Sequence, residues 1–224
     1  MELLCGQTGP KSKRNGKFRN RADAGRQLAS ALSSYAEQPD VIVLALPRGG
    51  VPVASEVARA LHAPLDIFLV RKLGVPGQEE LAMGAIASGH GIVLNELVIK
   101  TLQISPDVLA EVTEKEEEIL KTRETLYRGG RPALPLSGRT LLVVDDGLAT
   151  GSTMRAAVIA LRHQHPKQIV VAVPVAPPDT CDALRQVADD VVCLHQPEPF
   201  QAIGQWYKDF SPTTDEEVLR FLKT

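Results

Sequence analysis

Residues 141–161 read LLVVDDGLATGSTMRAAVIAL, an apolar run, a polar turn and an Ala-rich run in immediate succession. A short continuous apolar run is typical of a strand buried on both faces, and the run from Ser152 to Leu161 carries apolar residues at helical spacing. The order strand, turn, helix indicates one unit of a parallel α/β sheet. Two adjacent acids, Asp145 and Asp146, stand where the strand ends.

The same kind of apolar run occurs four more times along the chain. These runs cover residues 41–46, 65–70, 169–175 and 191–194. Helical patterns lie before and between them, at residues 21–36, 51–61 and 180–187. Strands that alternate with helices predict an α/β fold with a doubly wound, mainly parallel sheet.

The middle of the chain adds a longer helix and a second type of strand. A helix is expected from Pro106 to about Tyr127, because Ser105 can cap it and proline is favoured at the first position. Its acidic run, residues 114–118, fits a solvated helix face better than a partner surface. Residues 80–87 are expected to enter a strand.

Composition and charge narrow the class of protein. The chain has 224 residues, of which 44% are hydrophobic, and a formal net charge of -2. These values predict one globular domain and argue against nucleic acid as a partner, since such binding needs a basic surface. Cys5, Cys181 and Cys193 form no C-x-x-C pair, and no apolar stretch approaches the roughly 20 residues that span a bilayer. We therefore expect a cytoplasmic protein with free thiols and no membrane partner.

The turn after the acids has the parts of an anion site. Gly151 permits close approach of a ligand to the backbone, and Thr150, Ser152 and Thr153 supply hydroxyl groups at a helix N-terminus, which favours anions. The segment lacks the lysine of the common mononucleotide loop and the glycines of the dinucleotide fingerprint. Two carboxylates beside a phosphate would repel it unless they face sugar hydroxyls or a divalent cation. An acidic turn that only caps the helix is the alternative.

The stretch VVDDGLATGST, residues 143–153, resembles the phosphoribosyl pyrophosphate signature of type I phosphoribosyltransferases. The resemblance implies that Asp145 and Asp146 contact the ribose 2- and 3-hydroxyls and that the following loop wraps the 5-phosphate. It also implies a Mg²⁺ cofactor that bridges pyrophosphate and ribose oxygens, with the two acids as metal residues acting through water. The substrate-binding loop would then comprise Gly147, Leu148, Ala149, Thr150, Gly151, Ser152 and Thr153.

A second turn, LPRGG at residues 46–50, follows the first predicted strand. It combines the guanidinium of Arg48 with the permissive backbone of Gly49 and Gly50, which suits a second anion. A simple strand-to-helix turn with an exposed arginine is the alternative. By resemblance, this loop binds pyrophosphate and carries a cis peptide between Pro47 and Arg48.

Two further cations, Arg71 and Lys72, follow the second predicted strand. They resemble an Arg-Lys pair that faces pyrophosphate in orotate phosphoribosyltransferases, so they are candidates for stabilising the leaving group; a solvated charge pair is the alternative. Residues 74–80 would belong to a mobile lid. The order PRGG, VRK, Glu-x-Ala-x-Gly-Ala and DDG-x-ATG is similar to a predicted bacterial phosphoribosyltransferase group, and the similarity extends over about residues 18–222.

The resemblance divides the chain into an N-terminal extension (1–17) expected to be poorly ordered, a core (18–196) with a helical insertion at about 105–128, and a small C-terminal hood (197–224). The hood gathers aromatic residues in a chain with few of them. Their rings could stack on a planar acceptor or pack the tail onto the sheet. They are Phe200, Trp206, Tyr207 and Phe210, of which Trp206 and Tyr207 are the candidates for the acceptor site.

The resemblance implies an enzyme, a homodimer that transfers the 5-phosphoribosyl group of phosphoribosyl pyrophosphate to a nitrogenous base or a related small acceptor and releases pyrophosphate. Catalysis would be electrostatic, with Asp145, Asp146, Arg48, Arg71 and Lys72 as catalytic residues and no covalent nucleophile. Ala149 stands where hypoxanthine and guanine enzymes carry a third acid, which disfavours a 6-oxopurine acceptor bound through that acid. A regulatory protein that binds phosphoribosyl pyrophosphate or nucleotides without turnover is the alternative.

Overall fold

The computed structural model describes residues 16–89 and 91–223. Its main sheet has five parallel strands in the order β2-β1-β6-β7-β8. The predicted doubly wound, mainly parallel sheet is therefore confirmed. Its strands are β1 (Val41–Ala45), β2 (Leu65–Ile67), β6 (Thr140–Val144), β7 (Gln168–Val175) and β8 (Asp190–His195).

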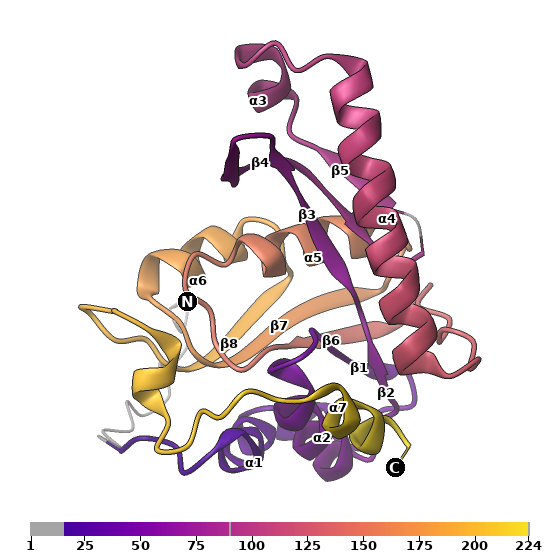
Figure 1. Cartoon of the computed structure of the whole chain (residues 1–224). Coiled ribbons are helices and arrows are strands. Elements are labelled where there is room, and N and C mark those ends of the chain that lie inside the picture. The colour runs from indigo at the N-terminus through magenta and orange to yellow at the C-terminus, as the bar shows by residue number, and fades with distance from the viewer. Residues whose placement is uncertain (1–15, 90, 224) are drawn as a thin grey trace, which may run out of the picture.

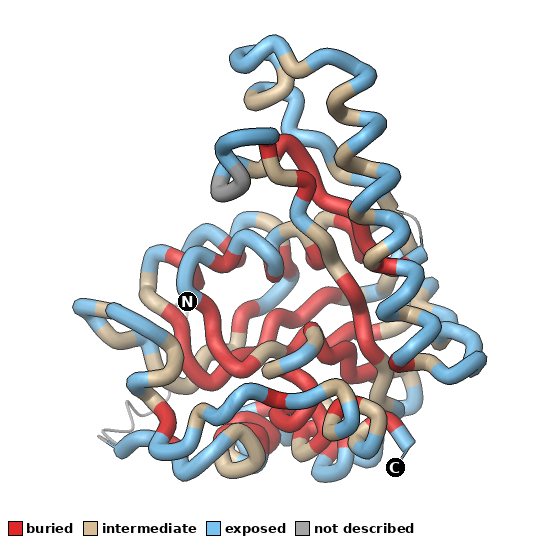
Figure 2. The backbone as a smooth tube through the Cα atoms, in the orientation of Figure 1, coloured by how far each residue is buried: buried red, intermediate tan, exposed pale blue. Residues whose placement is uncertain are grey.

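Helices cover both faces of this sheet (Figure 1). On one face lie α1 (Arg21–Ala31) and α2 (Gly50–Leu61), and on the other α5 (Ser152–Arg162) and α6 (Pro178–Arg185). Alternate residues of β1 enter the two cores: Val43 packs with the α1 and α2 side, and Leu44 with the α5 and α6 side. This arrangement explains the continuous apolar runs, and Figure 2 shows the burial along the central strands.

A second, antiparallel sheet rises beside the main one (Figure 1). It contains β3 (Val70–Val75), β4 (Gln78–Ala87) and β5 (Gly91–Leu94), and is followed by α3 (Glu96–Thr101) and α4 (Pro106–Arg128). The predicted strand at 80–87 and the predicted long helix are confirmed. The Ser105 hydroxyl caps α4 by accepting a 3.3 Å hydrogen bond from the backbone N–H of Val108.

The prediction of a single strand at 65–70 is wrong. The strand β2 ends at Ile67, and the chain crosses to the second sheet before Val70 begins β3. Phe68 and Leu69, at the crossing, are 3% and 5% exposed. Because both are buried, the apolar run continues through the crossing and gives no sign of the change of sheet.

The bounds of two helices and the form of the tail also differ from the prediction. The helix predicted at 21–36 ends at Ala31 and is followed by the short η1 (Ser33–Tyr35), and the helix predicted at 180–187 begins earlier, at Pro178. The tail divides into two parts: η2 (Ile203–Trp206) lies over the end of the sheet, whereas α7 (Asp215–Leu222) packs against α2 and α4. Most of the predicted extension, residues 1–15, lies outside the described residues.

Of the helices in the described ranges, none has both the length and the apolar character required to cross a membrane.

Candidate functional site

The two motif loops leave neighbouring strands at the same edge of the main sheet. β1 pairs with β6 in parallel, with Ala45 opposite Val144. From β1 the chain continues to β2 on one side, and from β6 to β7 on the other. The gap between β1 and β6 is therefore the topological switch point, where open α/β sheets bind their ligands. The PRGG loop follows β1 and the DDGLATGST loop follows β6.

The two loops touch each other through the glycines. A Cβ atom on Gly49 would lie 2.7 Å from Cγ of Asp146, and one on Gly50 would lie 2.7 Å from the carbonyl oxygen of Val144 and 3.1 Å from Oδ1 of Asp145. Contacts this short leave no room for a side chain at either position. The expected cis peptide is also present, between Pro47 and Arg48. The two loops that the sequence singled out therefore lie in contact with each other.

The paired acids are held close together, with Asp146 buried and Asp145 partly buried. Asp146 is 8% exposed, and its backbone N–H donates a 2.8 Å hydrogen bond to Oδ1 of Asp145. Burial raises the pKa of Asp145 well above its usual value, and the charge of Asp146 raises it further. Burial also raises the pKa of Asp146, although the guanidinium of Arg21 opposes this shift. Two desolvated carboxylates favour a ligand that brings hydroxyl donors or a cation.

A direct consequence is that Asp145 destabilises the ligand-free fold at neutral pH. The pKa of Asp145 is higher in the folded protein than its value of 3.8 in the unfolded chain. Below pH 3.8 the carboxyl is protonated in both states and does not destabilise the fold. As the pH rises from 3.8 through the folded pKa, the free energy of unfolding falls. Asp145→Asn should therefore raise Tm at pH 7 by a few degrees, since about 1 kcal/mol shifts Tm by about 2–4 °C in a domain of this size. Calorimetry from pH 4 to pH 8 without ligand measures this difference.

Asp189→Asn provides a control of opposite sign. Partial burial tends to raise the pKa of Asp189, but hydrogen bonds from Arg162 and from the backbone of Ile169 lower it overall. The carboxylate therefore stabilises the fold above its unfolded pKa, and this substitution should lower Tm at pH 7. An unchanged or lower Tm for Asp145→Asn would contradict the interpretation that the Asp145 carboxylate destabilises the ligand-free protein.

The predicted phosphate loop lies at the N-terminus of α5. Thr150, Ser152 and Thr153 are exposed, and the hydroxyls of the first two lie 3.0 Å apart. Gly151 is the N-cap of the helix at φ +69°, a left-handed conformation that glycine adopts without steric cost. Exposed hydroxyls and helix N–H groups at one helix end form an arrangement that can hold a phosphate.

Sequence reasoning missed the residue that supports this loop. The hydroxyl of Thr180, in the first turn of α6, donates a 2.8 Å hydrogen bond to the carbonyl oxygen of Ala149, and its methyl carbon would lie 2.8 Å from a Cβ on Gly151. Thr180 is 7% exposed. The loop is therefore held from below by a residue about 30 positions away in the chain, and no local pattern signals such a contact.

Thr180→Val tests this support, because it removes the hydroxyl and keeps the methyl group against Gly151. Loss of one hydrogen bond from a buried hydroxyl group costs about 1 kcal/mol. We expect phosphate-containing ligands to bind about fivefold more weakly and the unfolding midpoint to fall by a few degrees. Titration with inorganic phosphate and with phosphoribosyl pyrophosphate measures the first effect. Equal affinities in the variant and the parent protein would show that the loop needs no such support.

Most of the chain matches one family of known proteins. The sequence profile described as the phosphoribosyl transferase domain matches residues 16–208. The chain belongs to the phosphoribosyltransferase family. Two proteins from two strains of Mycobacterium tuberculosis, both provisionally named phosphoribosyl transferases, are 46% identical to it over 205 residues, or 92% of the chain. The chain spans about half the length of these curated relatives (46%).

A solved structure is similar to the chain in both sequence and fold. The crystal structure of TT1426 from Thermus thermophilus superposes with a TM-score of 0.83 and 41% sequence identity, and the match covers 92% of this chain and 97% of that one. The α/β fold with a mainly parallel sheet described above is thus shared with this solved structure.

The three predicted cations of this phosphoribosyltransferase domain lie in different places. Arg48 is half exposed on the loop after β1, and its side chain reaches toward α7, with Nη1 3.7 Å from Oδ1 of Asp215. Arg71 does not follow a strand of the main sheet, as predicted, but lies inside β3, where its Nε donates a 2.7 Å hydrogen bond to Glu116 of α4. Lys72 is the next residue of β3 and is exposed. Only Arg48 stands on one of the two site loops.

The acidic run of α4 therefore contains one residue with a specific contact, because Glu116 pairs with Arg71 at a partly buried position. The predicted lid, residues 74–80, contains the turn between β3 and β4, and its mobility stays a prediction.

The hood is attached directly to the acid loop. Tyr207 is 4% exposed, and its hydroxyl donates a 2.5 Å hydrogen bond to the carbonyl oxygen of Asp146. The centre of its ring lies 5.4 Å from that of Phe18 and 5.0 Å from that of Phe210. Tyr207 therefore supports the loop and offers no open ring face to an acceptor. Trp206 stacks on His195 at 5.8 Å and is half-buried. Trp206 remains a candidate for the acceptor site.

A second residue missed by sequence reasoning is Arg21, the first residue of α1. Its Nε donates a 2.7 Å hydrogen bond to Oδ2 of Asp146, and both side chains are 11% exposed. The two residues are 125 positions apart. A cation at a helix N-terminus is mildly unfavourable, and this was the one local sign that the residue has another task.

Proposed function

We propose that this domain transfers the 5-phosphoribosyl group of phosphoribosyl pyrophosphate to a nitrogenous base or a related small acceptor and releases pyrophosphate. The observation that carries the proposal is the contact of the two motif loops at the switch point, where Gly49 lies against Asp146 and Gly50 against Asp145. A ligand in that position would meet the loop at the N-terminus of α5, the pair of acids and the PRGG loop that carries Arg48. Phosphoribosyl pyrophosphate carries a complementary group for each of them.

The residues have distinct tasks in this proposal. Asp145 and Asp146 accept hydrogen bonds from the ribose hydroxyls and fix the sugar, and the loop from Ala149 to Thr153 binds the 5-phosphate. Arg48 neutralises the negative charge that develops on the departing pyrophosphate, which is the group whose stabilisation most lowers the barrier. Asp145 and Asp146 act by position and charge and attack no atom.

The donor set fits a Mg²⁺ ion that arrives with the substrate. Within residues 16–89 and 91–223 no group of three or more His, Cys, Asp and Glu side chains could hold a metal. Magnesium is commonly bound by one or two carboxylates together with substrate phosphates and water, and Asp145 and Asp146 supply that number. When bound, the ion would neutralise charge on the pyrophosphate oxygens.

The acceptor is expected beside the contact between the hood and the acid loop. Ile203 of the hood packs on Gly147, where its side chain leaves no room for a Cβ, and Tyr207 holds the same loop from behind. Trp206 is one of the partly exposed aromatic residues of the hood. The exposed Ala149 offers no acid to a purine nitrogen, so adenine, pyrimidines and smaller heterocycles are the first acceptors to screen.

Calorimetric titration of the full chain with phosphoribosyl pyrophosphate and Mg²⁺, followed by a pyrophosphate-release assay with a panel of bases, tests the proposal. Saturable binding and base-dependent release are the expected results. Binding without release for any base would favour the regulatory alternative. Absence of binding to the folded protein, with and without bases, would overturn both.

A further inference from the structure

One guanidinium joins the acid pair to the hood. Besides its bond to Asp146, Arg21 donates a 2.6 Å hydrogen bond from Nη1 to the carbonyl oxygen of Ser211, and its guanidinium carbon lies 4.0 Å from the centre of the Phe210 ring. These partners are a carboxylate, a backbone carbonyl and an aromatic face. The planar fork of arginine can satisfy all three at once, which the single ammonium of lysine cannot do.

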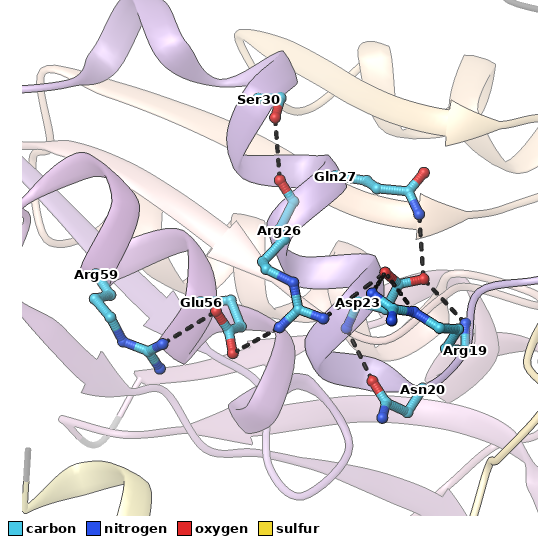
Figure 3. A network of polar contacts seen from close by, with 8 residues as sticks. All are labelled: Arg19, Asn20, Asp23, Arg26, Gln27, Ser30, Glu56 and Arg59. Atoms are coloured by element: carbon cyan, nitrogen blue, oxygen red, sulfur yellow. Dashed lines mark hydrogen bonds and ion pairs between the residues drawn. The ribbon is translucent and has the colours of Figure 1, made fainter.

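The helix that carries Arg21 is fixed at its first turn. Asn20 caps α1 by accepting a hydrogen bond from the backbone N–H of Asp23, and Asp23 also accepts hydrogen bonds from the backbone and side chain of Arg19. One turn further on, Arg26 pairs with Glu56 of α2 at 3.3 Å (Figure 3). A Cβ on Gly25 would lie 2.6 Å from the carbonyl oxygen of Val53, so the two helices cross in close contact.

The geometry leaves one oxygen of the acid for a ligand. Arg21 donates to Oδ2 of Asp146, which is also the oxygen nearer to Gly49, whereas Oδ1 accepts no hydrogen bond from the side chain of another described residue. The ion pair is largely shielded from solvent, so it restrains the carboxylate more strongly than a surface pair would. Oδ1 is therefore the oxygen presented to a ribose hydroxyl.

The hood contacts converge on the same group. Phe210, under Arg21, packs on Tyr207 and would lie 3.0 Å from a Cβ on Gly204 of η2. Tyr207 in turn bonds the backbone of Asp146. The acid is thus held by the hood twice, through its own carbonyl oxygen and through Arg21.

We propose that Arg21 is a positioning residue that orients Asp146 for ribose binding and couples this orientation to the docking of the hood through Phe210 and Ser211. The inference rests on the proposed function, because it assigns Asp146 to the ribose. It predicts that residues which contact no part of the sugar, such as Phe210, affect the affinity for phosphoribosyl pyrophosphate through Arg21.

The first test compares Arg21→Met with Arg26→Met, a matched change one turn away on the same helix that removes the anchor to α2. Calorimetric titration with phosphoribosyl pyrophosphate and Mg²⁺ should show affinity at least tenfold lower for Arg21→Met and within twofold of the parent for Arg26→Met. Arg21→Lys should recover part of the loss. Thermal unfolding of each variant confirms that it is folded.

The second test is a double-mutant cycle between Arg21→Met and Phe210→Leu. If the hood acts on the acid through Arg21, each single change weakens binding and the double change weakens it by less than the product of the two factors. Amide hydrogen exchange without ligand adds a readout that does not depend on binding. Residues 203–211 should exchange faster in Arg21→Met and at the parent rate in Arg26→Met.

Outcomes separate the two proposals. A parent protein that binds no phosphoribosyl pyrophosphate overturns the proposed function and, with it, this role of Arg21. A parent protein that binds, with unchanged affinity in Arg21→Met or an equal loss in Arg26→Met, overturns the inference about Arg21 alone. Strictly multiplicative effects in the cycle would refute the coupling to the hood.

Discussion

The Asp145→Asn, Asp146→Asn double variant is expected to lose binding of phosphoribosyl pyrophosphate by more than about 100-fold. Each substitution removes an ionised acceptor, and a hydrogen bond to a charged group contributes about 1.5–3 kcal/mol, so the pair accounts for about 3 kcal/mol or more. The variant should nevertheless fold, because replacing two buried carboxylates by amides relieves their desolvation and mutual repulsion. Calorimetric titration with Mg²⁺ present measures the affinity, and circular dichroism the fold.

The chain contains its own control for this experiment. Asp189 and Asp190 form another adjacent acid pair, at the start of β8 and therefore at the opposite edge of the sheet. Asp189→Asn, Asp190→Asn should reduce stability, since Asp189 pairs with Arg162, and leave the affinity unchanged. Full binding by the Asp145, Asp146 variant, or equal losses in the two variants, would refute the assignment of the ribose site.

Gly49→Ala is expected to disable the site by adding a single methyl group. The backbone of Gly49 is in the ordinary helical region, at φ -61° and ψ -33°, so alanine fits the backbone without strain. Its Cβ would lie 2.7 Å from Cγ of Asp146, which real contacts do not allow, so the carboxylate must move. We expect affinity for phosphoribosyl pyrophosphate to fall at least tenfold and stability to fall by about 1–3 kcal/mol, as for other overpacked positions.

Gly91→Ala is the matched control, because the nearest atom to its Cβ would be 3.8 Å away, in the side chain of Ala160. This variant should bind and unfold like the parent protein. Parent-like affinity in Gly49→Ala would mean that the position of the Asp146 carboxylate does not matter for binding, and both the ribose assignment and the role of Arg21 would fail with it.

Much of the fold could be predicted because its signals are local. The apolar runs at β1, β6, β7 and β8 and the Ala-rich helices between them follow from periodicity within a few residues. The prediction failed at residues 65–70, where the chain passes from the main sheet to the second sheet. Phe68 and Leu69 lie in this crossing and are buried, so the apolar run continues without a break. Arg71 was consequently assigned to the end of a strand, whereas its guanidinium faces Glu116 from inside β3.

By itself, the sequence determined the alternation of strands and helices, the family and the two motif loops, because short motifs require particular residue types at fixed spacing. Only the tertiary structure decided that these loops meet at the switch point between β1 and β6. It also decided that Arg21 and Thr180 support them and that Tyr207 lies beneath the acid loop as a support. Such contacts join residues up to 125 positions apart, and their geometry arises from the packing of whole elements, which no local pattern encodes.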